Sequence, residues 1–149
     1  MSKIAFIFPG QGAQAAGMGK DFYEQSATAR EVFDKASKLL GFSMPELCFE
    51  PNDRLDITEY TQAAMVTTSI AMMKVLEEKG VKPDVAAGLS LGEYCALAAA
   101  GVMSEEDAIK TVRQRGILMQ EAVPVGQGAM AAILALDAAA IEEVTGSME

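Results

Sequence analysis

The chain has 149 residues, half of them apolar, with a net charge of −9 and a sequence pI near 4.5. This length suits one domain with a sizeable core. The acidic balance argues against nucleic acid as a partner, because binding to its phosphates needs clustered Lys and Arg. The longest apolar stretch free of glycine and charge, 94–100, is far below the roughly 20 residues that span a bilayer. The short apolar start is also no signal peptide, and we therefore expect a cytoplasmic protein without a membrane segment.

The chain contains no histidine and only two cysteines, Cys48 and Cys95. Their wide separation lacks metal-ligand spacing, so we interpret them as reduced, packed thiols and predict no metal site. Without histidine, the chain lacks an imidazole metal ligand and the usual base of a catalytic triad. A serine nucleophile in this chain would need its base from elsewhere.

The first predicted element is a short buried strand over 3–8, which a Pro-Gly pair ends. A glycine-rich loop follows over 10–19. Thr28 and Glu31 have capping-box spacing, and apolar residues then recur at helical intervals as far as Gly41. We predict an amphipathic helix there.

The middle of the chain alternates predicted helices and strands. A short helix is expected after Ser43, then a polar loop over 50–58 and a long helix over 59–79. A short apolar run predicts a strand over 85–89, and a helical pattern predicts a helix over 91–100. The predicted core face of the long helix consists of Met65, Ser69, Met72, Met73 and Leu76.

The last third begins with another capping signature at Ser104, which predicts a helix to about Gln120. A linker over 123–128, a strand over 129–136 and a helix capped by Asp137 are predicted to follow. Strands that alternate with helices indicate an α/β fold with a mainly parallel sheet.

The segment 88–92 reads Gly-Leu-Ser-Leu-Gly and joins a predicted strand to a predicted helix. In this pattern the turn projects the serine hydroxyl outward and presents the following N–H, that of Leu91, to a reacting carbonyl. Ser90 is therefore a candidate nucleophile, although the same spacing also suits a structural turn. Glu93 could accept its proton only poorly, because a carboxylate does not match imidazole near neutral pH.

The glycine-rich loop admits two interpretations, since its backbone could approach either phosphates or a developing oxyanion. Residues 10–15 fit G-x-G-x-x-A, but the acidic residues about 20 positions later, Glu31 and Asp34, fall within a predicted helix rather than at a strand end. The P-loop pattern fails because Met18 stands where lysine is required.

Three segments together resemble the malonyl-CoA:acyl carrier protein transacylase family. They are 8–14 (Phe-Pro-Gly-Gln-Gly-Ala-Gln), 88–94 (Gly-Leu-Ser-Leu-Gly-Glu-Tyr) and 114–120 (Gln-Arg-Gly-Ile-Leu-Met-Gln), in that family's order and spacing. The resemblance implies an α/β-hydrolase-like acyltransferase core with a parallel sheet, begun by residues 1–122. Residues 123–149 would form a linker and the beginning of a small ferredoxin-like subdomain.

By this resemblance, Ser90 attacks the thioester of malonyl-CoA, and the resulting malonyl-serine is transferred to the phosphopantetheine thiol of acyl carrier protein in fatty acid biosynthesis. The N–H groups of Gln11 and Leu91 would form the oxyanion hole, and Arg115 would bind the malonyl carboxylate through its guanidinium fork. No cofactor is implied, because the partner carries the phosphopantetheine. Arg113 is expected to remain a surface charge, and with Lys110 and Arg115 it is a candidate basic patch for the carrier protein.

Two features depart from the family. Leu89 stands where histidine is common, which affects only local packing. The family is roughly twice as long, and its catalytic histidine comes from the second half, so we expect an N-terminal fragment that is inactive without that half. A serine esterase or thioesterase fragment, or a non-catalytic binding fragment, are the alternatives.

Overall fold

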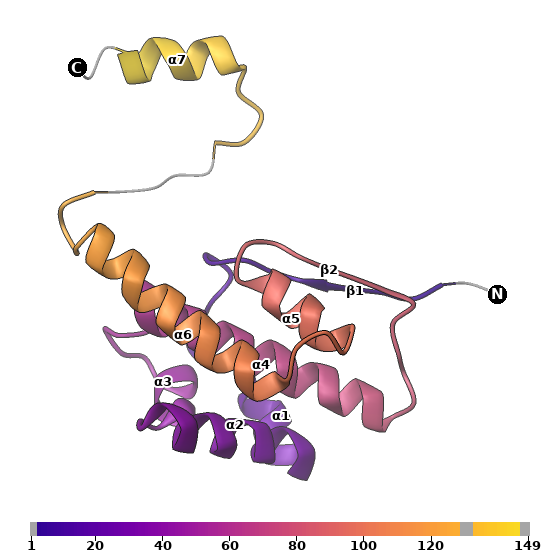
Figure 1. Cartoon of the computed structure of the whole chain (residues 1–149). Helices are drawn as coiled ribbons and strands as arrows, with labels where there is room; N and C mark the ends of the chain where they lie inside the picture. The colour runs from indigo at the N-terminus through magenta and orange to yellow at the C-terminus, as the bar shows by residue number, and fades with distance from the viewer. Residues whose placement is uncertain (1–2, 129–132, 147–149) are drawn as a thin grey trace.

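The computed structural model describes residues 3–128 and 133–146. Two parallel strands, β1 (Ala5–Phe8) and β2 (Val85–Gly88), pair with Ala5 opposite Val85 and Phe8 opposite Gly88 (Figure 1). The helices are α1 (Lys20–Gln25), α2 (Ala27–Leu40), α3 (Met44–Phe49), α4 (Thr58–Glu78), α5 (Gly92–Ala99), α6 (Glu105–Ala122) and α7 (Ala138–Gly146).

The sheet confirms the predicted α/β class, because its strands are parallel and the chain between them contains α1 to α4. Parallel strands require such a crossover. Phe6 and Phe8 on β1 are buried in the core, whereas Ile7 points the other way and is 71% exposed. Helix α5 packs on both strands, which places the junction of β2 and α5 beside the end of β1.

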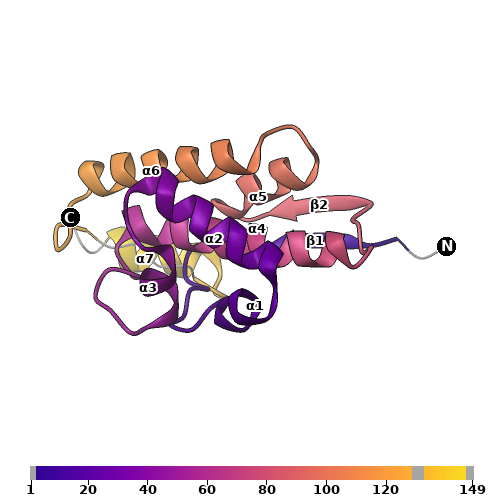
Figure 2. The same cartoon turned by 90° about the horizontal axis from the view of Figure 1, so that it is seen from below.

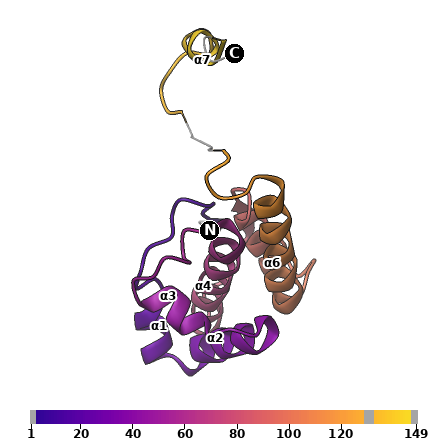
Figure 3. The same cartoon turned by 90° about the vertical axis from the view of Figure 1, so that its left-hand side faces the viewer.

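Helix α4 is the centre of the core and lies between α2 and α6 (Figures 2 and 3). The predicted core face is only partly right: Met65 and Met73 are buried, but Leu76 is 38% exposed. Val66 and Ile70, outside that face, are fully buried. A helix covered on several sides needs apolar residues around most of its circumference, so a single-face pattern describes it poorly.

The helix starts follow local capping. Ser43 and Ser104 cap α3 and α6 as predicted, each accepting a hydrogen bond from a backbone N–H of the first turn. The predicted start at Thr28 is wrong, because Ser26 caps α2 by accepting from the N–H of Ala29 at 3.2 Å. Ser26 has extended backbone angles, as an N-cap requires, while Thr28 lies inside the helix and donates to Glu78 at 2.7 Å. Helix α1 was not predicted, and it has no side-chain cap at its start.

The final segment contains α7, which begins after Asp137 as predicted and lies apart from the other helices in Figures 1 and 3. Of the predicted strand over 129–136, residues 129–132 lie outside the described part, and the described residues 133–136 are not a strand. A strand needs a neighbour to satisfy its backbone groups, and no described strand borders this segment. The domain boundary after residue 122 and the ferredoxin-like subdomain stay predictions.

Within the described ranges, no helix is long and apolar enough to cross a bilayer.

Candidate active site

Ser90 stands in a strained turn between β2 and α5. Its φ of 53° lies in the left-handed region, which residues other than glycine rarely enter. Both flanking glycines are required by space: a Cβ on Gly88 would collide with the backbone of Gly92, and a Cβ on Gly92 would lie 2.5 Å from the carbonyl oxygen of Phe8. The turn is therefore the strained elbow that exposes a serine hydroxyl at the start of a helix.

The glycine-rich loop and the elbow are in close contact. The N–H of Leu89 donates to the carbonyl of Phe8 at 3.1 Å, and a Cβ on Gly10 would lie 3.0 Å from the Leu89 oxygen. Within the described ranges, neither the N–H of Gln11 nor that of Leu91 donates a hydrogen bond. Both donors are therefore unpaired on neighbouring loops, as an oxyanion hole requires.

Side chains of the glycine-rich loop attach it to the segment that leads into α4. Gln11 donates its amide to the hydroxyl of Thr58 at 3.1 Å. Gln14 accepts from the N–H of Gly12 at 2.8 Å and donates to Asp56 at 2.9 Å. These contacts fix the loop through side chains and leave the Gln11 N–H free.

Arg115 on α6 reaches the elbow. Its Nη2 donates to Ser90 Oγ at 3.1 Å, and its Nη1 donates to Oε1 of Gln62 at 2.6 Å. No carboxylate among the described residues forms an ion pair with Arg115. A cation next to the serine hydroxyl, with no anionic partner among the described side chains, can bind an anionic group of a substrate held at that serine.

Gln62, on α4, is the residue that sequence reasoning missed. It is fully buried, and its Nε2 contacts the sulfur of Met119 at 3.2 Å. A buried amide needs partners, and Gln62 finds one of them in Arg115. The available signal was a glutamine at the start of a largely apolar helical run, but nothing local linked it to residue 115.

Gly116 lies where α6 crosses the start of α4. A Cβ there would lie 2.8 Å from the Cα of Glu59 and 3.0 Å from the carbonyl oxygen of Thr58. This glycine allows the helices to approach closely and brings Arg115 within reach of Gln62. It does not end the helix, which continues to Ala122.

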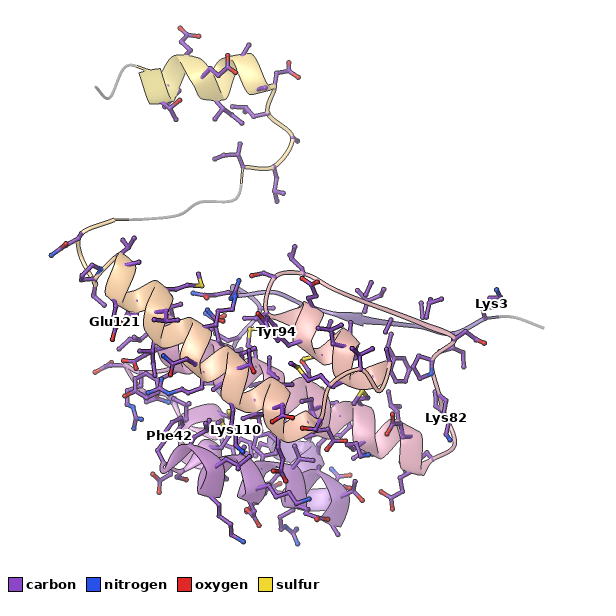
Figure 4. The ribbon with its side chains drawn as sticks, viewed as in Figure 1. Lys3, Phe42, Lys82, Tyr94, Lys110 and Glu121 are labelled. Atoms are coloured by element: carbon purple, nitrogen blue, oxygen red, sulfur yellow. The ribbon has the colours of Figure 1, made fainter. Side chains whose placement is uncertain are left out.

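Arg113 is not the surface charge that the sequence suggested. Its side chain is only 19% exposed, forms an ion pair with Glu59 at 2.9 Å and donates to the Glu59 carbonyl. The guanidinium also lies over the rings of Tyr60 and Phe42, at 4.5 and 5.5 Å from their centroids. The face of α6 that carries Arg113 therefore packs on α4. Arg113 cannot join Lys110 in an exposed basic patch; Lys110 and the ring of Phe42, over which Arg113 lies, are labelled in Figure 4.

Both cysteines are free and buried, as expected. Burial raises the pKa of the Cys48 thiol and of the Cys95 thiol to about 12. Neither thiol is therefore a nucleophile near neutral pH, since thiolate is the reactive form. Among the residues that the structure describes, no group of three or more His, Cys, Asp or Glu side chains could hold a metal ion.

An exposed serine in a strained strand-to-helix turn of a parallel α/β fold is the arrangement typical of serine enzymes that form acyl-serine intermediates. Within this class, the chain belongs to the acyl transferase domain family, which matches residues 5–148.

Individual relatives within this family have a more specific description than the family itself. The chain is 53% identical to the malonyl CoA-acyl carrier protein transacylase of Bacillus subtilis over 97% of its own length and 46% of the relative's. For the Staphylococcus aureus protein of the same description, the identity is 46% over 99% of this chain and 48% of the relative.

Solved structures that resemble this chain are also malonyl-transacylases. The malonyl CoA-acyl carrier protein transacylase of Coxiella burnetii superposes with a TM-score of 0.88 at 44% identity, covering 98% of this chain and 47% of that one. A type II PKS acyl-carrier protein in complex with its malonyl-transacylase gives a TM-score of 0.88 at 42% identity, with coverage of 98% and 48%. The chain thus has the fold of part of these enzymes and spans about half the length of the curated relatives it matches.

Proposed function

We propose that this chain supplies the nucleophile and the carboxylate-binding arginine of a malonyl-CoA:acyl carrier protein transacylase. The observation that carries the proposal is the contact of Arg115 Nη2 with Ser90 Oγ at 3.1 Å. A malonyl group on Ser90 would place its carboxylate two bonds from the carbonyl carbon, near this guanidinium. An acetyl group offers no charge to it, so the arginine favours malonyl.

The reaction proceeds in two acyl transfers. Ser90 Oγ attacks the thioester carbonyl of malonyl-CoA, the N–H groups of Gln11 and Leu91 stabilise the oxyanion, and the C–S bond breaks to release the CoA thiol. The phosphopantetheine thiol of acyl carrier protein then attacks the malonyl-serine ester and releases Ser90. The acyl group moves only between sulfur and oxygen, so the chemistry requires no metal or redox cofactor.

Ser90 also needs a base to accept its proton, and the chain contains no histidine. The proposal assigns this role to a histidine in a C-terminal half, because the relatives are about twice as long as the matched region. The 149 residues alone are then expected to bind substrate without turning it over.

Intact-mass measurement after treatment with malonyl-CoA tests the proposal. The chain is measured alone and mixed with a histidine-bearing C-terminal half, for example that of the Bacillus subtilis relative. We expect a malonyl adduct on Ser90 only in the mixture, and none with Ser90→Ala. An adduct on any other residue would refute the assignment of the nucleophile.

Arg115→Ala tests the substrate. The variant should lose about tenfold or more of its preference for malonyl-CoA over acetyl-CoA, since hydrogen bonds to a charged group are among the strongest polar contacts. Retained preference would place the carboxylate elsewhere.

Hydrolysis is the alternative fate of the acyl-serine, because esterases share the elbow. Product analysis in the same mixture, with and without acyl carrier protein, distinguishes the two reactions. Transfer predicts malonyl-carrier protein as the main product, whereas free malonate at an equal rate without the carrier would indicate a hydrolase.

A further inference from the structure

The guanidinium of Arg115 is held at both of its ends in different ways. Nη2 faces the exposed hydroxyl of Ser90, whereas Nη1 faces the buried amide oxygen of Gln62 at 2.6 Å. The second contact is the shorter, and Gln62 is fully buried on the central helix α4. The buried end is therefore the fixed one, and the end toward Ser90 is the one that a substrate can reach.

The amide of Gln62 can have only one orientation here. Its Nε2 contacts the sulfur of Met119 at 3.2 Å, and turning the amide over would place an NH2 group against the guanidinium of Arg115. Two donors facing each other would leave the buried amide and the Nη1 of Arg115 without an acceptor. Packing around α4 thus fixes the acceptor that receives Nη1.

The neutrality of this acceptor matters. A carboxylate in place of the amide would form an ion pair with Arg115 and compete with an anionic substrate for the same cation. An amide oxygen holds the guanidinium in place and leaves its positive charge uncompensated.

We propose that Gln62 is a positioning residue that sets the preference for carboxylate-bearing acyl groups by holding Arg115 with its free end at Ser90. The inference rests on the proposed function of Arg115 as the carboxylate-binding residue. Arginine is long and flexible, so without this anchor the guanidinium must be ordered each time that substrate binds.

Equilibrium binding of malonyl-CoA and acetyl-CoA to the 149-residue chain tests the role without requiring turnover. Gln62→Met keeps the side-chain length and removes the acceptor, and we expect the malonyl-to-acetyl affinity ratio to fall about tenfold with acetyl-CoA binding unchanged. Gln62→Glu should lower the ratio as well, because its carboxylate pairs with Arg115. The matched control is Thr67→Val, another buried polar side chain of α4, which should keep the wild-type ratio.

Circular dichroism establishes that each variant is folded, and Gln62→Glu decides the question if Gln62→Met does not fold. A purely structural role would weaken both ligands equally and leave the ratio unchanged, which would overturn the inference. If Arg115→Ala loses the preference while both Gln62 variants keep it, the inference fails and the proposed function stands. If Arg115→Ala keeps it too, or the wild type shows none, the carboxylate role of Arg115 itself fails.

Discussion

Replacing Gly116 by alanine sets two opposing effects against each other at the crossing of α6 and α4. Alanine is favoured over glycine inside a helix by up to about 1 kcal/mol. The added Cβ, however, would lie 2.8 Å from the Cα of Glu59, while carbon atoms in contact normally stay about 3.5 to 4.0 Å apart. The obstacle is backbone and cannot rotate away, and such overpacking costs about 1 to 3 kcal/mol. We therefore expect Gly116→Ala to lower the free energy of unfolding by about 1 kcal/mol.

Urea unfolding followed by circular dichroism measures this difference. Gly146→Ala is the matched control, because Gly146 also lies in a helix but a Cβ there would meet nothing within 4 Å. That variant should be unchanged or slightly more stable. If Gly116→Ala were as stable as the wild type, the close contact between this glycine and the backbone of Thr58 and Glu59 would not limit the size of the side chain, and the reasoning would be refuted. If Gly116→Ala were as stable as the wild type but preferred malonyl-CoA less strongly than the wild type, the result would show that α6 and α4 move apart at this crossing without loss of stability.

Three further predictions concern the elbow, the core and the thiols. Ser90→Gly should be about 1 kcal/mol more stable than Ser90→Ala and should melt at a higher temperature, because only alanine is strained at a φ of 53°. Equal melting temperatures would argue against backbone strain at this position. Thr67→Val should raise the free energy of unfolding by about 1 kcal/mol, since the Thr67 hydroxyl is buried without a partner among the described residues. A lower urea midpoint in this variant would show that the hydroxyl has a hydrogen-bond partner in the folded protein. Burial raises the pKa of Cys48 and Cys95 from 9 to about 12. The stability from these protonated thiols is therefore complete below pH 9 and is lost as the pH rises toward 12. Urea midpoints measured on both sides of pH 9 should show the decline, which Cys→Ala variants should reduce; an undiminished decline would assign it to other groups.

The sequence predicted most of the elements because their signals are local. Capping serines at 43 and 104 identified two helix starts, and the short apolar run over 85–89 identified β2. The miss at Thr28 has the same local origin: Ser26, two residues earlier, also fits a cap, and only the backbone geometry of the folded chain distinguishes the two. The strand expected over 129–136, whose described residues 133–136 are not a strand, shows the limit of such signals, since a strand depends on a neighbour that local sequence does not specify.

The elbow around Ser90 could likewise be predicted from five consecutive residues, because its strain and its glycines are properties of that short segment. What only the tertiary structure decided is the surroundings of the arginines. Arg113 and Arg115 are two positions apart, yet Arg113 is partly buried against Glu59 and aromatic rings while Arg115 extends from Gln62 to Ser90. Glu59, Gln62 and Ser90 lie 25 to 54 residues away from these arginines in sequence, and the arginines reach Glu59 and Gln62 because α6 crosses α4 closely at Gly116. Five consecutive residues therefore predicted the candidate nucleophile, and the packing of α6 on α4 determined which cation stands beside it.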